Sequence, residues 1–126
     1  MKKPSLDLWL AEAKAHPDAH KVGMYLTHNG VVRSTARVQA RYGQEADPVR
    51  GMVFRWDQQT VREAVSAAEK LEGIHYVRVW LNEGDLAVGD DIMQVLIGGD
   101  IRSRTVAALE YLVARLKNEC VTETEV

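Results

Sequence analysis

Alternating runs of apolar and polar residues divide the chain into helices and strands. Ser5 precedes apolar residues at helical spacing and is expected to cap a helix, which Pro17 ends because proline disfavours helix in the residue before it. Segment 21–33 has the composition of a strand, and segment 50–57 gives a second one. Between these strands, segment 34–50 has little apolar periodicity and is predicted to be a loop with the composition of a mobile segment.

The second half of the chain also alternates between predicted helices and strands. Asp57 is expected to cap a helix that runs to about Leu71, where Gly73 stops it. Segment 74–81 follows as a strand, residues 82–91 form a turn-rich connector, and residues 92–99 form another strand. Asp100 is then expected to cap a last helix from Ile101 to about Lys117, in which leucines recur at helical spacing.

The order of elements, helix, strand, strand, helix, strand, strand, helix, predicts an α+β domain with its helices packed on a mainly antiparallel sheet. With 126 residues and 46% apolar content, residues 1–126 suit one domain with one core, the first 20 residues forming an N-terminal helical segment. No internal repeat or low-complexity tract interrupts it.

Charge and cysteine content narrow the class of protein. The formal net charge is −2, so we expect no nucleic-acid or membrane-surface partner, and any anion site must be local. The single cysteine, Cys120, excludes an internal disulfide framework and fits a reducing compartment. Since no apolar stretch approaches about 20 residues and no signal peptide stands at the N-terminus, a cytoplasmic location is expected.

Two clusters of arginines are candidates for an anion site. Arg33 and Arg37 follow the first strand in the stretch HNGVVRSTAR, where a planar guanidinium suits a phosphate or carboxylate, although a solvated loop would look the same. Arg102 and Arg104 stand in the first helical turn after GGD, a position that favours anions and disfavours cations, unless the glycines simply turn the chain.

Lys117 lies at the other end of that last helix, where a cation also suits the terminal carbonyls for structural reasons. It is 15 residues from Arg102, or about 22 Å along a straight helix at about 1.5 Å per residue. One small ligand therefore cannot contact both residues of one chain. If both are functional, they serve separate sites, or a symmetric dimer brings the start of one copy's helix near the end of the other's.

The remaining chemistry-bearing residues have weaker signals. Pro17 spoils helical metal-ligand spacing between His16 and His20. His28 and His75 suit hydrogen-bonded strand or loop positions, with His28 retained as a site candidate because it lies beside the arginine loop. Cys120 has no recognisable histidine partner and is expected to be a buried or idle thiol.

Three segments in order, GVVRS (30–34), EGDLAVGDDIMQVLI (83–97) and IRSRTVAALEYLVARLKNE (101–119), resemble the large, catalytic subunit of molybdopterin synthase. The resemblance implies an α+β domain of the α/β-hammerhead type. It also implies a homodimer that receives the C-terminal thiocarboxylate of a small ubiquitin-like partner and passes sulfur to cyclic pyranopterin monophosphate, with no metal or organic cofactor.

By position, the resemblance assigns substrate binding to Arg33 and, across the dimer, to Arg102, and an active-site role to Lys117. Their neighbours Arg37 and Arg104 are added as substrate-binding candidates.

The sequence also departs from the family pattern. A histidine expected before the helix arginine is Ile101, a second lysine seven residues after Lys117 is Thr124, and Arg55 replaces a common acidic residue. The family's basic C-terminal arm is expected to be missing, and Glu123 and Glu125 would repel an anionic substrate if they faced the pocket. Three hypotheses follow: a sulfur-transferring synthase subunit, a noncatalytic homologue that binds a phosphorylated pterin-like anion or a ubiquitin-like tail, and an unrelated phosphate-ester enzyme.

Overall fold

A computed structural model describes residues 2–126 and confirms the α+β class. The helices are α1 (Leu6–Lys14), a 3-10 helix (Ala19–Lys21), α2 (Arg37–Tyr42), α3 (Gln58–Glu69), α4 (Arg102–Arg115) and a π-helix (Leu116–Cys120). The strands are β1 (Met24–Val31), β2 (Gly51–Trp56), β3 (Ile74–Leu81), β4 (Gly84–Ala87), β5 (Asp91–Gly99) and β6 (Val121–Glu125).

The strands form two antiparallel sheets rather than the single sheet that the sequence predicted. One three-stranded sheet has the order β1-β5-β3 and the other has the order β4-β2-β6. The chain changes sheets at residues 82–83, just after β3, so β4 pairs with β2 although it follows β3 directly.

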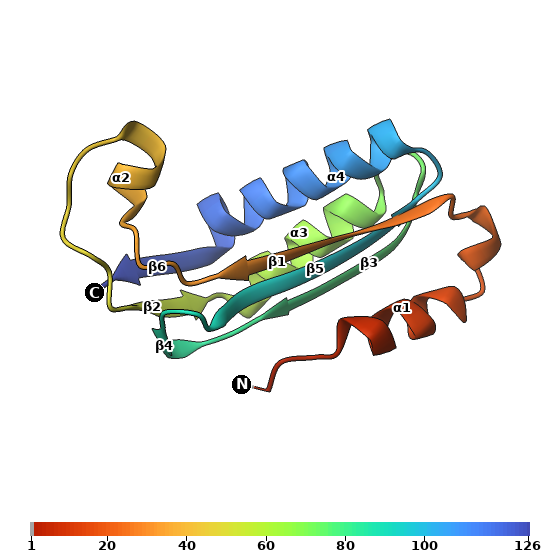
Figure 1. The fold of residues 1–126 in the computed structure, drawn as a ribbon. Helices are drawn as coiled ribbons and strands as arrows, with labels where there is room; N and C mark the ends of the chain where they lie inside the picture. Colours follow the sequence, from red (N-terminus) through yellow and green to blue (C-terminus); the bar gives the residue numbers. More distant parts are fainter. Residues whose placement is uncertain (1) are drawn as a thin grey trace.

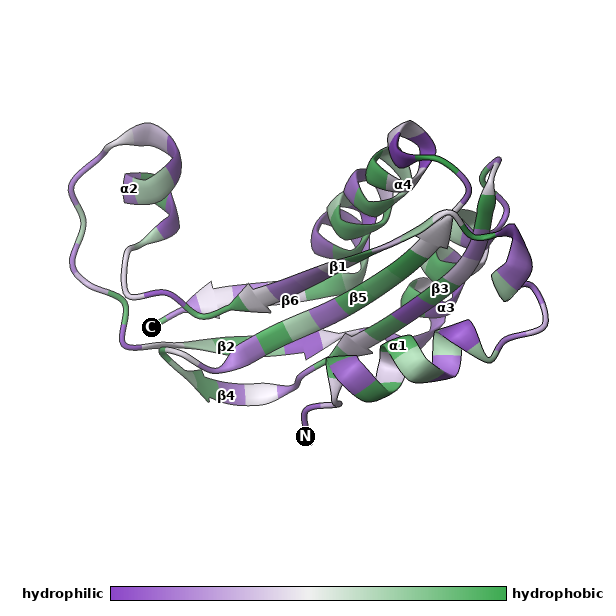
Figure 2. Cartoon of the chain, turned by 45° about the vertical axis from the view of Figure 1, so that its right-hand side comes forward, coloured by the Kyte–Doolittle hydropathy of each residue, from purple (hydrophilic) through white to green (hydrophobic). Residues whose placement is uncertain are grey.

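Helices cover both faces of the β1-β5-β3 sheet, with α1 on one face and α3 and α4 on the other (Figure 1). β5 is buried along most of its length because side chains alternate between these two faces. Leu96 packs in the cluster of Trp9 from α1, whereas Val95 joins the larger core around Leu112 from α4. The near-continuous apolar run of this strand is therefore explained by burial on both sides (Figure 2).

Two of the predicted helix caps are confirmed and one is wrong. Ser5 Oγ accepts a hydrogen bond from Leu8 N at 3.2 Å, and Asp57 Oδ2 accepts one from Thr60 N at 2.9 Å. The N-cap of α4 is Ile101 rather than Asp100, and no side chain caps it. Asp100 instead accepts hydrogen bonds from Ile101 N and from the Arg104 side chain, so its carboxylate stabilises the turn before the helix.

The predicted loops contain structure that periodicity missed. Helix α2 lies within segment 34–50 and projects beside the end of the sheets, and β4 lies within connector 82–91 (Figure 1). The last helix continues past Arg115 as the π-helix and leads straight into β6. Each of these elements is four to six residues long, which is too short for a periodic pattern to show. In residues 2–126 no helix has the length and apolar content needed to cross a membrane.

Candidate functional site

A pocket of about 220 Å³ opens beside α2 and is lined by residues of both sheets. Its apolar lining comes from Val31 at the end of β1, Met52 of β2 and Ile92 of β5. The register of β1 against β5 shifts between Gly30 and Val31, so Ile92 falls in the irregularity of the ladder. Such irregularities re-aim side chains and are common beside functional sites.

The pocket brings together three of the five predicted site residues. Arg33 lies just after β1, Arg37 opens α2 and Lys117 lies in the π-helix, and all three line the same cavity. Lys117 is far from the two arginines in the sequence, so its meeting with them is a property of the fold. Arg41, on the next turn of α2, adds a fourth cation that the sequence reading did not single out.

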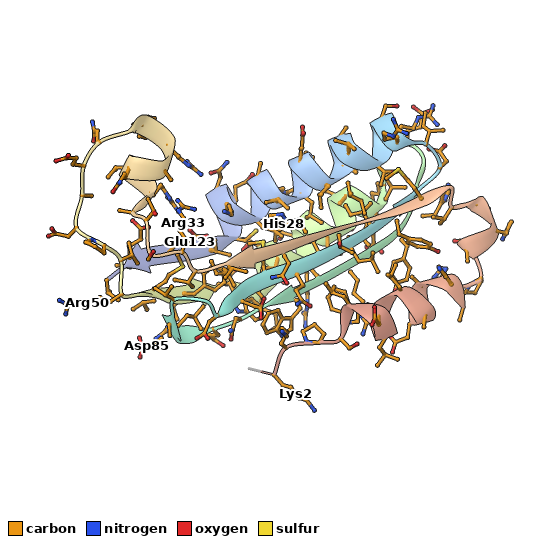
Figure 3. All side chains as sticks on the ribbon, in the orientation of Figure 1. Lys2, His28, Arg33, Arg50, Asp85 and Glu123 are labelled. Carbon is orange, nitrogen blue, oxygen red and sulfur yellow. The ribbon has the colours of Figure 1, made fainter. Side chains whose placement is uncertain are left out.

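Two carboxylates from β6 also line the pocket. Glu123 Oε2 lies 2.5 Å from a terminal nitrogen of Arg37, and its side chain is only 7% exposed. Glu125 accepts hydrogen bonds from the backbone N–H of Arg37 at 3.0 and 3.2 Å. Figure 3 shows Glu123 beside Arg33 below α2. The acidic residues that the sequence flagged as a conflict with anion binding therefore do face the cavity.

The positive charges of the pocket still outnumber the negative ones. Four basic side chains stand against two carboxylates. Arg33 donates from Nε to the carbonyl of Thr35 at 3.0 Å, which leaves its two terminal amino groups for other partners. Within residues 2–126, neither Lys117 nor Arg41 has a carboxylate within ion-pair distance. A local anion site on a slightly acidic protein is therefore electrostatically reasonable.

Lys117 is held at the pocket by an unusual helical turn. The π-helix buries its first and last residues, Leu116 and Cys120, in the core, while Lys117 remains exposed. Turns of this kind are rare and often occur at functional sites. The buried Cys120 thus has a packing role in this turn, in agreement with the expected inert thiol.

His28 is also part of the pocket and is not the hydrogen-bonded residue that was expected. Its Nε2 is buried and has no partner within residues 2–126. Burial, together with the positive charge of Lys117, lowers the pKa of His28, so its imidazole is neutral at neutral pH. Its side chain shares a strand face with Gly30, two residues on, which keeps this wall of the pocket open.

The position given to the family's second lysine does not face the cavity. Side chains of a strand alternate, and the pocket takes Glu123 and Glu125 from β6 but not Thr124 between them.

Arg102 and Arg104 lie at the opposite end of α4 from Lys117 and outside the pocket of a single chain. Arg104 forms ion pairs with Asp100 at 2.7 Å and Glu72 at 3.2 Å. These carboxylates explain why a cation is tolerated in the first helical turn. Arg102 is exposed and has no such pair within the described residues.

No metal site was expected at His16 and His20, and each has a local structural partner. His16 Nδ1 accepts from the Asp18 backbone N–H, and its ring packs edge-on against Tyr76. His20 Nδ1 lies 3.0 Å from the carbonyl oxygen of Pro17. Within residues 2–126, no group of three or more His, Cys, Asp or Glu residues is placed to hold a metal ion.

Comparison with known proteins places the chain in a family. The family model described as MoaE protein matches residues 4–119, which is most of the chain. The chain belongs to the MoaE family. This confirms the resemblance to the large subunit of molybdopterin synthase and, with it, the association of the family with molybdenum cofactor biosynthesis. No curated protein sequence matches the chain.

Solved structures share this fold at low sequence identity. The MoaE protein of Burkholderia ambifaria superposes with a TM-score of 0.74 at 19% identity, covering 100% of this chain and 84% of that one. Molybdopterin synthase from Staphylococcus aureus gives 0.67 at 14% identity, covering 84% and 75%. A complex of subunits 1 and 2 of molybdopterin-converting factor from Helicobacter pylori gives 0.68 at 17% identity, covering 95% and 74%.

Proposed function

We propose that this member of the MoaE family acts as the large subunit of a molybdopterin synthase. It would take sulfur from the C-terminal thiocarboxylate of a small ubiquitin-like carrier and transfer it to cyclic pyranopterin monophosphate, in the cytoplasm. The observation that carries the proposal is the convergence of Arg33, Arg37 and Lys117 on one pocket.

Each of these side chains suits a step of that reaction. The terminal amino groups of Arg33 suit the substrate's phosphate, because a guanidinium binds a phosphate through paired hydrogen bonds. As the thiocarboxylate sulfur bonds to a substrate carbon and an oxygen leaves that carbon, the ammonium of Lys117 would stabilise the negative charge that develops, or its neutral amine would take up the acyl group. Hydrolysis then leaves one sulfur on the substrate and an ordinary C-terminal carboxylate on the carrier, so each dithiolene uses two carriers.

The small carrier is supported by the Helicobacter pylori structure, which is a complex of two subunits of molybdopterin-converting factor. A homodimer is supported by geometry. Arg102 lies about 22 Å from Lys117 along the helix, so only a second copy can bring it to the pocket. We therefore propose that Arg102 of one copy completes the site of the other. Arg104 is already held by two ion pairs within its own chain, so we assign it a supporting role beside Arg102 in substrate binding.

A noncatalytic binding protein is the second candidate, and the two carboxylates in the pocket favour it. Glu123 neutralises Arg37 in this chain. Glu123 and Glu125 also place negative charge in a pocket where positive charge would favour catalysis on an anionic substrate. Such a protein would bind a phosphorylated pterin-like anion or the carrier's tail without turnover.

Reconstitution separates the two candidates. The chain would be mixed with a thiocarboxylated small partner and cyclic pyranopterin monophosphate, and the dithiolene product would be measured together with binding of each component. We expect product above the level of a reaction without the chain. Binding of both components with no product supports the noncatalytic candidate, and absence of binding and product contradicts both.

A further inference from the structure

Segment 37–48, which contains α2, stands off the end of the two sheets and supplies one wall of the pocket (Figure 1). None of its residues is buried. Its two ends are fixed, because Ala36 and Val49 are each only 7% exposed and Val49 N donates a hydrogen bond of 2.7 Å to Ser34 O. Compact surface loops whose ends lie close together in this way are frequently functional. The segment is therefore anchored at its two ends and exposed between them.

Arg37 makes the contacts that hold this segment against β6. A terminal nitrogen of its side chain lies 2.5 Å from Glu123 Oε2, and its backbone N–H donates to Glu125 at 3.0 and 3.2 Å. Apart from the helical bonds of α2 to Ala36, no other residue of the segment is hydrogen-bonded or ion-paired to the rest of residues 2–126. The position of the segment thus depends on two carboxylates.

In this position the pocket is small for a ligand. Its volume of about 220 Å³ is below the range of about 300–1,000 Å³ that is typical of small-molecule sites. The same arrangement buries Glu123 Oε1 and His28 Nε2, and neither atom has a hydrogen-bond partner within residues 2–126. Burial of polar atoms without partners is costly, and an opening that admits water removes this cost. The Arg37 contacts therefore hold the segment closed against an opposing free energy.

We infer that segment 37–48 is a lid over the pocket and that Glu123 and Glu125 latch it closed through Arg37, so that a ligand enters only after these contacts are released. The inference rests on the proposal that this pocket is the functional site, and it adds how access to that site is regulated. Once the lid is open, water solvates both carboxylates and reduces their repulsion of an anion. The acidic residues of β6 thus control entry to the pocket.

Hydrogen exchange of the full chain, followed by mass spectrometry, measures opening of the lid. The backbone amides of residues 39–43 should exchange about tenfold faster in Glu123→Gln than in wild type, since a hydrogen bond between charged groups is worth about that factor. The amides of β5 should keep their wild-type exchange, which shows that the variant is folded. Glu125→Ala, at an exposed position, serves if Glu123→Gln does not fold, and it should speed the same lid amides by about threefold.

A matched pair of variants separates the latch from a general charge effect. Glu123→Gln and Arg37→Gln change the net charge in opposite directions but break the same ion pair. Both should speed exchange of the lid amides, and the double variant should give about the same tenfold increase rather than the product of the two increases. Glu119→Gln removes a carboxylate that is paired with Arg115 outside the pocket, and it should leave the lid amides unchanged.

Access to the pocket is measured with diethyl pyrocarbonate, a small neutral reagent that modifies uncharged imidazole. His28 lines the pocket and its Nε2 is buried, so its modification should be slow in wild type. It should be several-fold faster in both Glu123→Gln and Arg37→Gln, because the two variants open the same lid. The exposed His20 is an internal reference within each sample.

Several results would overturn the inference. These are wild-type lid amides that exchange at the rate of an unstructured peptide, lid exchange that Glu123→Gln and Arg37→Gln leave unchanged, an equal increase in Glu119→Gln, or a released segment with no faster modification of His28. Neither measurement needs a carrier or turnover, so the outcome is distinct from that of the reconstitution. A latch that both variants release, in a chain that forms no product, would leave the inference standing and remove the sulfur-transfer proposal. Product from a chain whose lid exchange ignores both variants would do the opposite.

Discussion

The two ends of α4 both carry basic residues, but the structure uses them differently. At the first end, Arg104 is matched by Asp100 and Glu72, so its charge is largely balanced within the chain. Beyond the C-terminal end, in the π-helix, Lys117 lines the same pocket as the arginines of segment 33–41. The cations that line this pocket outnumber its carboxylates. A basic residue therefore indicates a ligand site when no carboxylate of the chain is paired with it. Clustering of basic residues in the sequence does not show whether such pairing occurs.

The largest effect is expected at Lys117. Lys117→Ala should reduce the rate of dithiolene formation in the reconstituted reaction by about 10²–10³-fold, which is typical for removal of one group that stabilises transition-state charge. The matched control is Lys14→Ala, which removes the same charge from the last turn of α1, outside the pocket. A Lys117→Ala protein that transfers sulfur at the wild-type rate would show that the surplus charge is not catalytic.

A second comparison concerns the two faces of β6. Glu125→Lys changes the pocket by two charge units and should tighten binding of inorganic phosphate by about tenfold at low salt, as expected for partly solvated charges. Thr124→Lys adds a lysine at the position suggested by the family spacing, but on the outward face, and should change the affinity by less than about threefold. Isothermal titration of each variant measures both values. Stronger tightening by Thr124→Lys would mean that β6 has the opposite register.

A smaller effect, on stability, is expected at the N-terminal end of α4. Arg104→Ala should lower the free energy of unfolding in urea by about 1 kcal/mol, since it removes two partly exposed ion pairs and leaves Asp100 without its partner. Arg102→Ala, two residues away, should change it by less than about 0.5 kcal/mol. Similar losses in the two variants would contradict the difference in pairing that separates these arginines.

The smallest effect concerns pH. The folded chain lowers the pKa of His28, so the unfolded chain binds its proton more readily. Stability from this residue is therefore complete above its ordinary pKa of about 6.5 and is lost as the pH falls below that value. The melting temperature of wild type should fall more between pH 7.5 and 5.5 than that of His28→Gln. The substitution keeps every other ionisable group lining the pocket, namely Arg33, Arg37, Arg41, Lys117, Glu123 and Glu125, so parallel curves would contradict a lowered pKa.

The sequence predicted those parts of the fold that depend on local patterns. Capping by Ser5 and Asp57 is encoded by a few neighbouring residues, and the long helices have clear periodicity. Helix α3 ends at Glu69, and Gly73, with a φ of 79°, lies in the turn between this helix and β3. The two sheets were not predictable in the same way, because β4 and β6 are short and are defined by pairing with β2. Pairing between distant segments leaves little trace in a single sequence.

The candidate site was predictable only in part. Arg33, Arg37 and Lys117 were identified by chemistry, by their place at the ends of elements and by the family resemblance, and they share one pocket. Arg41 was missed because helix α2 is set by tertiary packing. His28 was retained as a candidate beside the arginine loop, and it lines the pocket. The alternation of Glu123 and Glu125 would have been visible if β6 had been recognised as a strand.

The π-helix joins α4 to β6 with no loop between them, so the phase of one element sets the phase of the other. A strand has a side-chain period of two, and a single-residue deletion within Leu116–Cys120 would turn each side chain of β6 to the other face. Thr124 and Val126 would then take the two cavity-lining positions of Glu123 and Glu125, and both carboxylates would leave the lining. The length of this turn therefore sets the electrostatic character of the cavity.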